Sequence, residues 1–445
     1  MCGIAGFCNF KENFEENTDY WNFCLEKMRA VLAHRGNDAR GRFLKKHIGL
    51  SHSRLAIRDI LCGDQPMTRT HNGYDYTICY NGEIYNTDEL IPELSENGFV
   101  CSTTSDTEVI LYAYIHWGAD FVSRLNGIFA FAIWDAAKNR LLLYRDRVGV
   151  KPLFYAIRGD SLVFGSEPKA CFAHPAVKPE LDKQGLQELL AIGPAHTSGL
   201  SLFKDLFEVL PGHFMIYSKD GLHDETYWEL TSREHTDSYQ DTVAHTRFLV
   251  EDAIKRQMVS DVPVCTFLSG GIDSSIVTAI AANYMNTRGK TLNTFSFDFK
   301  DNDRYFKANA FQPERDLPYV NRMLEEYETA HSYLECDENS LFKALFAAVD
   351  AKDMPGMTDV DSSLLYFCSL VSRKNKVALT GECADEIFGG YPWFYRKELL
   401  ERYGFPWSSD VAPRLALLRD DVGSELDLSG YQAFRYEESR SKAQI

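Results

Sequence analysis

The sequence has little of what marks a nucleic-acid binder, a membrane protein or a secreted scaffold. Its 445 residues carry 47 lysines and arginines against 64 aspartates and glutamates, a net charge of −17, so the basic field of a nucleic-acid groove is absent. No apolar run approaches the roughly 20 residues of a membrane-spanning helix. The eleven cysteines form no CxxC pair and are odd in number, which argues against a zinc site or a disulfide framework.

Internal repeats, low-complexity tracts and a basic-then-apolar leader are also missing, so we expect a folded cytoplasmic protein with reduced thiols. The length exceeds that of one ordinary domain. Residues 231–238 are polar and lack apolar periodicity, which predicts a linker. We therefore expect one domain over residues 2–230 and a second over residues 239–445.

Short strands separated by turns dominate the first half, which predicts stacked sheets covered by helices. The expected strands there are residues 48–57, 76–80, 128–134, 141–145 and 162–166, and the expected helices are residues 28–32 and 108–117. The second half alternates strands and helices, which predicts a parallel α/β domain. Its expected strands are residues 262–268, 292–299 and 377–380, and its expected helices are residues 243–259 and 273–284.

Cys2 directly follows the initiator methionine. Once Met1 is removed, an N-terminal cysteine carries both a thiol nucleophile and an α-amine, whose pKa of about 7.7–8.0 suits a general base. Taken alone, the position means little, because any residue can follow the initiator.

Three further positions each have a plain and a chemical interpretation. Asn81-Gly82 follows the strand expected at 76–80 and is either a hairpin turn or a pair of oxyanion-hole donors. Arg54 is either a surface ion-pair partner or a fork that binds a substrate carboxylate. Asp106 precedes a helix and is either its N-cap or the partner of a substrate α-amine.

Eight motifs of the first half resemble, in family order, the class II glutamine amidotransferase domain. They are residues 1–7 (MCGIAGF), 33–35 (AHR), 51–57 (SHSRLAI), 80–85 (YNGEIY), 105–110 (SDTEVI), 125–134 (LNGIFAFAIW), 145–155 (RDRVGVKPLFY) and 164–169 (FGSEPK). The resemblance implies an αββα sandwich of the N-terminal-nucleophile hydrolase type. It implies that Cys2 attacks the side-chain amide of glutamine and releases ammonia. It assigns catalysis to Cys2, Asn81 and Gly82, and glutamine binding to Arg54, Asn81, Gly82, Glu83 and Asp106.

The second half contains a glycine turn, Ser269–Ser275 (SGGIDSS), between an apolar strand and a helix. Two glycines let an anion approach the backbone, and the helix dipole with its free N–H groups favours phosphate oxygens. The turn lacks the Gly-Lys-Ser/Thr of a P-loop. A second segment, residues 380–386 (TGECADE), also follows a strand and brings three carboxylates together, which implies a cation. The plainer alternatives are a capped turn and an acidic helix N-terminus.

Together the two segments resemble the Rossmann-like ATP-pyrophosphatase domain of asparagine synthetases. The resemblance implies ATP and Mg²⁺ as cofactors, glutamine and aspartate as substrates, and a β-aspartyl-adenylate that ammonia converts to asparagine with loss of AMP. It assigns ATP binding to Leu268, Ser269, Gly270, Gly271, Asp273, Ser274, Phe297, Thr380 and Gly381, the acceptor or adenylate to Glu382 and Asp385, and Mg²⁺ to Asp273 and Asp385. We expect ammonia to travel inside the protein, a possible homodimer, and no nucleic-acid or membrane partner.

Two departures from the family keep other functions open. Family synthetases continue into a segment with a catalytic lysine, in Arg-Lys-Asp-Arg-Met-like and Ser-x-Glu-x-Arg-x-Pro-Phe-like motifs that do not occur here, so we expect a C-terminally shortened synthetase domain. Residues 353–361 (DMPGMTDVD) replace a Thr/Arg segment suited to aspartate. The alternatives are therefore amidation of a different carboxylate, or a chain with glutaminase or binding activity only.

Overall fold

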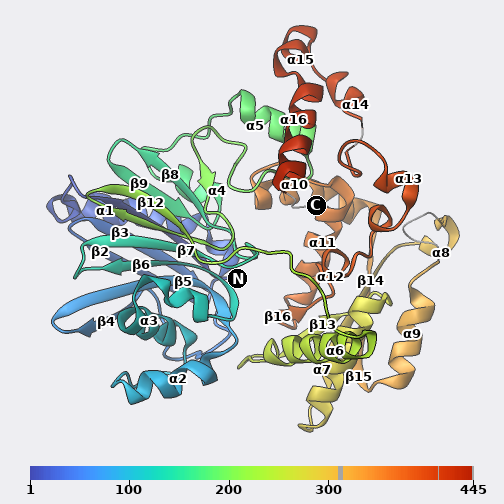
Figure 1. Cartoon of the computed structure of the whole chain (residues 1–445), viewed down its shortest axis with the longest axis horizontal. Coiled ribbons are helices and arrows are strands. Elements are labelled where there is room, and N and C mark those ends of the chain that lie inside the picture. The colour runs from blue at the N-terminus through green and yellow to red at the C-terminus, as the bar shows by residue number, and fades with distance from the viewer. Residues whose placement is uncertain (309–313, 409, 443–445) are drawn as a thin grey trace. The chain divides into compact units, whose positions relative to one another are not determined.

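The computed structural model describes residues 1–308, 314–408 and 410–442, drawn in Figure 1. The chain divides into two compact units, Met1–Ser232 and Arg233–Ile445. The predicted end of the second domain, residue 445, lies outside the described residues. Within the described ranges, every helix is too short or too polar to cross a membrane.

The first unit contains two six-stranded sheets whose neighbouring strands all pair antiparallel, in the orders β10-β8-β9-β1-β3-β2 and β12-β11-β7-β6-β5-β4. The strands are β1 Gly3–Asn9, β2 Ala39–Lys45, β3 Ile48–Arg54, β4 Met67–His71, β5 Tyr74–Ile84, β6 Gly127–Asp135, β7 Arg140–Arg145, β8 Phe154–Arg158, β9 Ser161–Gly165, β10 Phe207–Glu208, β11 His213–Ser218 and β12 Gly221–Thr226. The helices are α1 Thr18–Ala30, α2 Thr87–Glu96, α3 Asp106–Trp117, α4 Pro168–Phe172 and α5 Lys183–Gln187, with short turns at Phe14–Asn17, Ala33–Arg35, Ala119–Arg124 and Glu188–Ile192.

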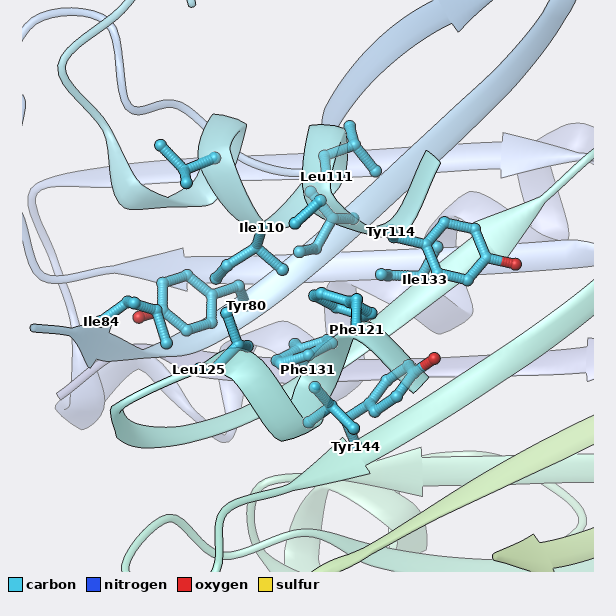
Figure 2. Packing of buried hydrophobic residues seen from close by; sticks show 14 of the residues in the cluster. Tyr80, Ile84, Ile110, Leu111, Tyr114, Phe121, Leu125, Phe131, Ile133 and Tyr144 are labelled. Atoms are coloured by element: carbon cyan, nitrogen blue, oxygen red, sulfur yellow. The ribbon is translucent and has the colours of Figure 1, made fainter. Parts of the chain in front are cut away.

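Apolar residues on alternate strand positions fill three layers of this unit. One core, which includes Leu50 and Ala132, lies between the two sheets. A second packs α1 and α4 against the first sheet through residues such as Met28. A third packs α3 against the second sheet, where Ile110 and Tyr114 meet strand residues (Figure 2). The helix–sheet–sheet–helix order confirms the predicted αββα sandwich.

At three places the structure excludes one of the alternatives left open by the sequence or changes the bounds of an expected element. β5 does not end at Tyr80, so Asn81 and Gly82 pair with Ala130 and Phe129 inside the ladder and form no hairpin turn. The helix expected at 28–32 is the end of α1, which begins at Thr18. Asp106 is the first residue of α3 rather than its cap, because the Ser105 hydroxyl accepts the Thr107 N–H at 3.3 Å.

The second unit is built on a parallel sheet in the order β15-β14-β13-β16, as the alternation of strands and helices predicts. Its strands are β13 Val264–Phe267, β14 Leu292–Phe299, β15 Thr329–Cys336 and β16 Val377–Leu379. Its helices are α6 Tyr239–Arg256, α7 Ile272–Asn286, α8 Asn302–Tyr305, α9 Leu317–Glu326, α10 Glu338–Lys352, α11 Thr358–Val371, α12 Ala384–Phe388, α13 Lys397–Leu400, α14 Ala412–Leu415, α15 Asp420–Leu426 and α16 Leu428–Lys442, with a short turn at Pro392–Phe394. The neighbouring strands β13 and β16 both end in the loops that the sequence singled out, so these loops share one edge of the sheet.

Candidate functional site

Cys2 precedes β1, a central strand of the first sheet, and its thiol lies against the end of neighbouring β3. Its Sγ donates to the Leu55 carbonyl at 3.6 Å and accepts the Leu55 N–H at 3.4 Å. The Cys2 carbonyl accepts a hydrogen bond from Arg35 Nε at 2.8 Å. Contacts from two separate segments therefore hold the thiol at one end of the sheet.

The electrostatics around Cys2 favour a neutral thiol beside a neutral amine. Burial raises the pKa of the Cys2 thiol, against the hydrogen bond from Leu55. Burial, followed by the charges of Arg35 and Lys151, lowers the pKa of the Met1 α-amine to about 6. An amine in this environment is mostly unprotonated at neutral pH and can accept a proton.

Asn81 and Gly82 lie on β5, flanked by residues that interact with Cys2. The charge of Cys2 acts on Cys79, and the charge of Glu83 acts on Cys2. Asn81 is 1% exposed, and its Nδ2 amide finds no hydrogen-bond partner among the described residues. A buried amide donor is rarely left unpaired, so this one is available to a ligand oxygen.

Gly82 has no room for a side chain. A Cβ there would lie 2.3 Å from the Ile128 carbonyl oxygen on neighbouring β6. The strand therefore requires glycine at this position for close packing, independently of any role in binding.

Glu83 and Asp106 form a buried acidic pair. Burial, and then the charge of Asp106, raise the pKa of Glu83 to about 8. Burial also raises the pKa of Asp106, whose Oδ2 accepts the Tyr80 hydroxyl at 2.8 Å and the Ile84 N–H at 3.0 Å. One guanidinium, Arg58, approaches Asp106 at 4.0 Å. The charges of Arg58 and Lys151 do not offset the effect of burial on Glu83, so the pair can accept a further cation, such as an amino-acid α-ammonium.

Arg54 is buried, and its guanidinium fixes the loop that follows β3. Nη1 donates to the Ile60 carbonyl at 3.2 Å and to Asp64 Oδ1 at 3.1 Å. Nη2 donates to the carbonyls of Arg58 and Asp59. These hydrogen bonds already occupy both Nη groups. The predicted binding of a substrate carboxylate by Arg54 therefore stays a prediction.

Sequence reasoning missed the residues that support this site. Arg35, which holds the Cys2 carbonyl, forms an ion pair with Glu167 at 2.7 Å. Burial opposes ionisation of Glu167, but hydrogen bonds from His34, Lys169 and Arg35 lower its pKa to about 2. The residues of this network lie in the AHR motif (33–35) and the FGSEPK motif (164–169). The presence of these two motifs was the signal in the sequence that could have indicated it.

In the second unit, the glycine turn is shaped by its serines and by Gly270. Ser274 Oγ lies 3.0 Å from Ser269 Oγ and accepts the Ser269 N–H at 3.2 Å. Gly270 has φ of +85°, and a Cβ there would lie 2.8 Å from the Asp316 carbonyl oxygen. Only glycine suits that position. The turn leads into the N-terminus of α7, where unpaired N–H groups attract anions.

A cavity of about 520 Å³ opens at this edge of the sheet. The predicted ATP-binding and acceptor residues that line it are Leu268, Ser269, Gly271, Asp273, Ser274, Phe297, Thr380, Gly381, Glu382 and Asp385. Gly270 is not among the lining residues. The fold therefore brings three separate segments of the chain to one cavity.

The two predicted magnesium ligands interact electrostatically. Burial, and then the charge of Asp385, raise the pKa of Asp273. Gly381 packs against Asp273, since a Cβ on Gly381 would lie 2.8 Å from the Asp273 Cβ. Within the described ranges, no three His, Cys, Asp or Glu side chains cluster as a metal cage. Two carboxylates suit Mg²⁺, which completes its shell with water and phosphate oxygens.

Phe297 lies where β14 extends beyond β13. The two strands pair as far as Phe295, whose carbonyl accepts the Leu268 N–H at 2.8 Å. Two residues further on, the Phe297 backbone faces the same side with no strand opposite it. Its N–H and C=O suit the donor–acceptor edge of an adenine ring. Asp298, missed from sequence, also lines the cavity and is held by Tyr333 and Asn302.

Residues 353–357 join α10 to α11, and residues 358–361 form the first turn of α11. Asp353 ends α10 with φ of +60°, and Asp361 accepts from Lys352 Nζ and from the Met357 N–H, both at 2.8 Å. The loop is thus organised by its own acidic residue.

Comparison with known proteins identifies the same two parts. The family described as a glutamine amidotransferase domain matches residues 1–228, and the family described as asparagine synthase matches residues 245–444. The chain is 47% identical to asparagine synthetase (glutamine-hydrolysing) 3 of Bacillus subtilis, over 100% of this chain and 72% of that protein.

Other relatives are more distant and not uniform in name. Asparagine synthetase (glutamine-hydrolysing) 1 of Bacillus subtilis is 33% identical over 90% of this chain and 60% of its own length. Amidase chyE of Penicillium rubens is 31% identical over 97% of this chain and 64% of its own length. The matches to both domains and to the full length of the chain show that it belongs to the glutamine-hydrolysing asparagine synthetase family.

Proposed function

We propose that this chain catalyses the ATP- and glutamine-dependent amidation of aspartate to asparagine. The observation that carries the proposal is the presence, in one chain, of a thiol hydrogen-bonded to Leu55, an unpaired buried amide on β5, and a cavity at a glycine turn with two interacting carboxylates. The first arrangement suits hydrolysis of an amide, and the second suits activation of a carboxylate.

In the first unit, glutamine binds with its α-ammonium on Glu83 and Asp106 and its side-chain amide next to Cys2. The free α-amine of processed Cys2 takes the thiol proton, and the thiolate attacks the amide carbon. Asn81 Nδ2 donates to the oxygen that becomes negative. Ammonia leaves, and water then hydrolyses the thioester to glutamate.

In the second unit, the glycine turn and the α7 N-terminus hold the phosphates of ATP while the Phe297 backbone holds adenine. The aspartate carboxylate attacks the α-phosphate, pyrophosphate leaves, and ammonia displaces AMP from the adenylate. Asp273 and Asp385 would hold Mg²⁺, which neutralises phosphate charge. Glu382 lines the cavity at the acceptor side of the reaction.

A direct assay tests the whole proposal. Incubation with aspartate, glutamine, ATP and Mg²⁺ is expected to yield asparagine, AMP and glutamate in equal amounts, measured by mass spectrometry. Absence of asparagine while AMP forms with another carboxylate would favour the second candidate, amidation of a different acceptor. The similarity to a protein named as an amidase and the acidic 353–361 loop motivate that candidate. If glutamate forms but no acceptor gives AMP, the chain has glutaminase activity and no synthetase activity.

Glu83→Gln is expected to raise the KM for glutamine about 10- to 100-fold, because the neutral amide cannot pair with the α-ammonium.

The raised pKa of Glu83 also predicts that glutamine binding depends on pH. Below about pH 8 the free acidic pair holds a proton that the α-ammonium must displace, so glutamine affinity should fall as pH falls from 8 to 6.

Calorimetric titration of glutamine into the hydrolysis-deficient Cys2→Ala protein, with and without Glu83→Gln, measures this dependence. The double variant should bind weakly at all of these pH values. Glu96→Gln, an exposed carboxylate on α2, is the matched control and should change nothing. Equal pH dependence with and without Glu83 would contradict the assignment.

A further inference from the structure

Lys151 is a buried cation whose side chain is directed at the first residue of the chain. It follows β7, is 7% exposed, and donates from Nζ to the Met1 sulfur at 2.9 Å. Two hydrogen bonds hold the backbone of Lys151. The Lys151 N–H donates to Asp146 Oδ2 at 2.9 Å, and the Lys151 carbonyl accepts from Arg145 Nε at 3.1 Å. The direction of the side chain is therefore set by the loop.

Within the described ranges Lys151 forms no ion pair, although the charges of Glu83 and Asp146 act on it and burial lowers its pKa. A buried ammonium without a counterion is unfavourable, and packing alone would be better served by methionine or leucine. The Met1 sulfur is a weak acceptor and does not offset this cost. The contact is also temporary if Met1 is removed, as the proposed nucleophile requires.

Removal of Met1 turns the backbone nitrogen of Cys2 into the α-amine. Lys151 already interacts electrostatically with both the Met1 amine and Cys2, so we expect its charge to act on the new amine as well. We propose that Lys151 is a positioning residue that keeps the α-amine of mature Cys2 unprotonated, so that this amine can accept the thiol proton during glutamine hydrolysis. The inference rests on the proposed function of Cys2. The physical reason is that a nearby positive charge disfavours protonation of an amine.

Other charged groups also act on the amine. Arg35 lowers its pKa more than Lys151 does, but Arg35 is itself ion-paired with Glu167. Glu83 opposes the effect from β5, although its raised pKa leaves it largely protonated at neutral pH. Arg54, at the end of β3, acts on the Cys2 thiol, and its guanidinium donates hydrogen bonds to carbonyls of the following loop. The thiol of Cys2 itself is the remaining group. Lys151 is thus the cation acting on the amine that, within the described ranges, has no ion-pair partner of its own.

The test compares Lys151→Met, which removes the charge, with Lys151→Arg, which keeps it. The readout is kcat/KM for glutamate release from glutamine between pH 5.5 and 9, together with the rate of Cys2 alkylation by chloroacetamide. Since the acid limb of kcat/KM also contains the ionisation of Glu83, the alkylation rate of Cys2 without glutamine is the deciding readout, and its acid limb should shift upward by about one pH unit in Lys151→Met. Activity should fall about tenfold on the acid limb and recover near pH 8.5. Lys151→Arg should retain the wild-type profile.

Lys138→Met, which removes an exposed lysine from the β6–β7 turn, is the matched control and should leave the profile unchanged. A uniform loss at every pH in Lys151→Met, with Lys151→Arg equally impaired, would overturn the inference and indicate a packing role. An unshifted acid limb would also overturn it. The intact mass and the glutaminase activity of the wild-type protein are measured first. Retention of Met1, or absence of glutamine hydrolysis, would contradict the proposed function itself. Either result is distinct from the outcomes of the Lys151 variants.

Discussion

Cys2→Ala is expected to abolish glutamine-dependent asparagine formation while ammonia-dependent formation continues. Alanine has no nucleophile, so glutamate release should fall by more than about 1000-fold. The second unit has its own cavity and its own carboxylates, and ammonium chloride at alkaline pH can supply the nitrogen directly. Glutamate, asparagine and AMP are measured in parallel with each nitrogen source.

Cys101→Ala provides the matched thiol control in the same unit. Burial raises the pKa of Cys101 to about 11, so this thiol is a poor nucleophile and its loss should leave both activities intact. Persistent glutamine hydrolysis in Cys2→Ala would mean that another group is the nucleophile. Loss of ammonia-dependent synthesis as well would point to misfolding, which a thermal unfolding curve detects.

Asp385→Asn is expected to remove ATP cleavage and leave glutamine hydrolysis within about twofold of wild type. The substitution keeps shape and removes one of two charges that suit Mg²⁺, so AMP and pyrophosphate formation should fall by more than about 100-fold. The charge of Asp385 also raises the pKa of Asp273, and that pKa should fall in the variant.

Glu401→Gln is the control for this experiment, because Glu401 is exposed and forms only a surface ion pair with Lys397 at 3.6 Å. It should retain full AMP formation. Wild-type AMP formation in Asp385→Asn would remove Asp385 from the metal site. Loss of glutaminase activity together with AMP formation would show that the substitution had disturbed the fold rather than the chemistry.

Local features of the sequence predicted the glycine turn and the parallel sheet because their determinants lie close together in the chain. Gly270 and Gly271 follow an apolar strand and precede a helix, and the structure places them between β13 and α7. The same local reasoning left a hairpin turn possible at Asn81 and Gly82, and the structure excludes it because this dipeptide lies inside β5. There the pairing with β6 outweighed the local preference for a turn.

The acidic pair of Glu83 and Asp106 required the tertiary structure. The two residues are 23 positions apart, and only the packing of α3 on β5 brings them together and raises their pKa values. The sequence motifs contained both residues but predicted neither their shared burial nor the approach of Arg58.

By itself, the sequence predicted a two-part organisation, a candidate nucleophile at Cys2 and a glycine turn suited to phosphate, because motif order and residue chemistry are properties of the chain. Only the tertiary structure decided how Arg35, Glu167 and Lys151 surround residues 1 and 2. The physical reason is that charge acts through space. Sheet order brings distant residues together, and burial then strengthens interactions that water would screen.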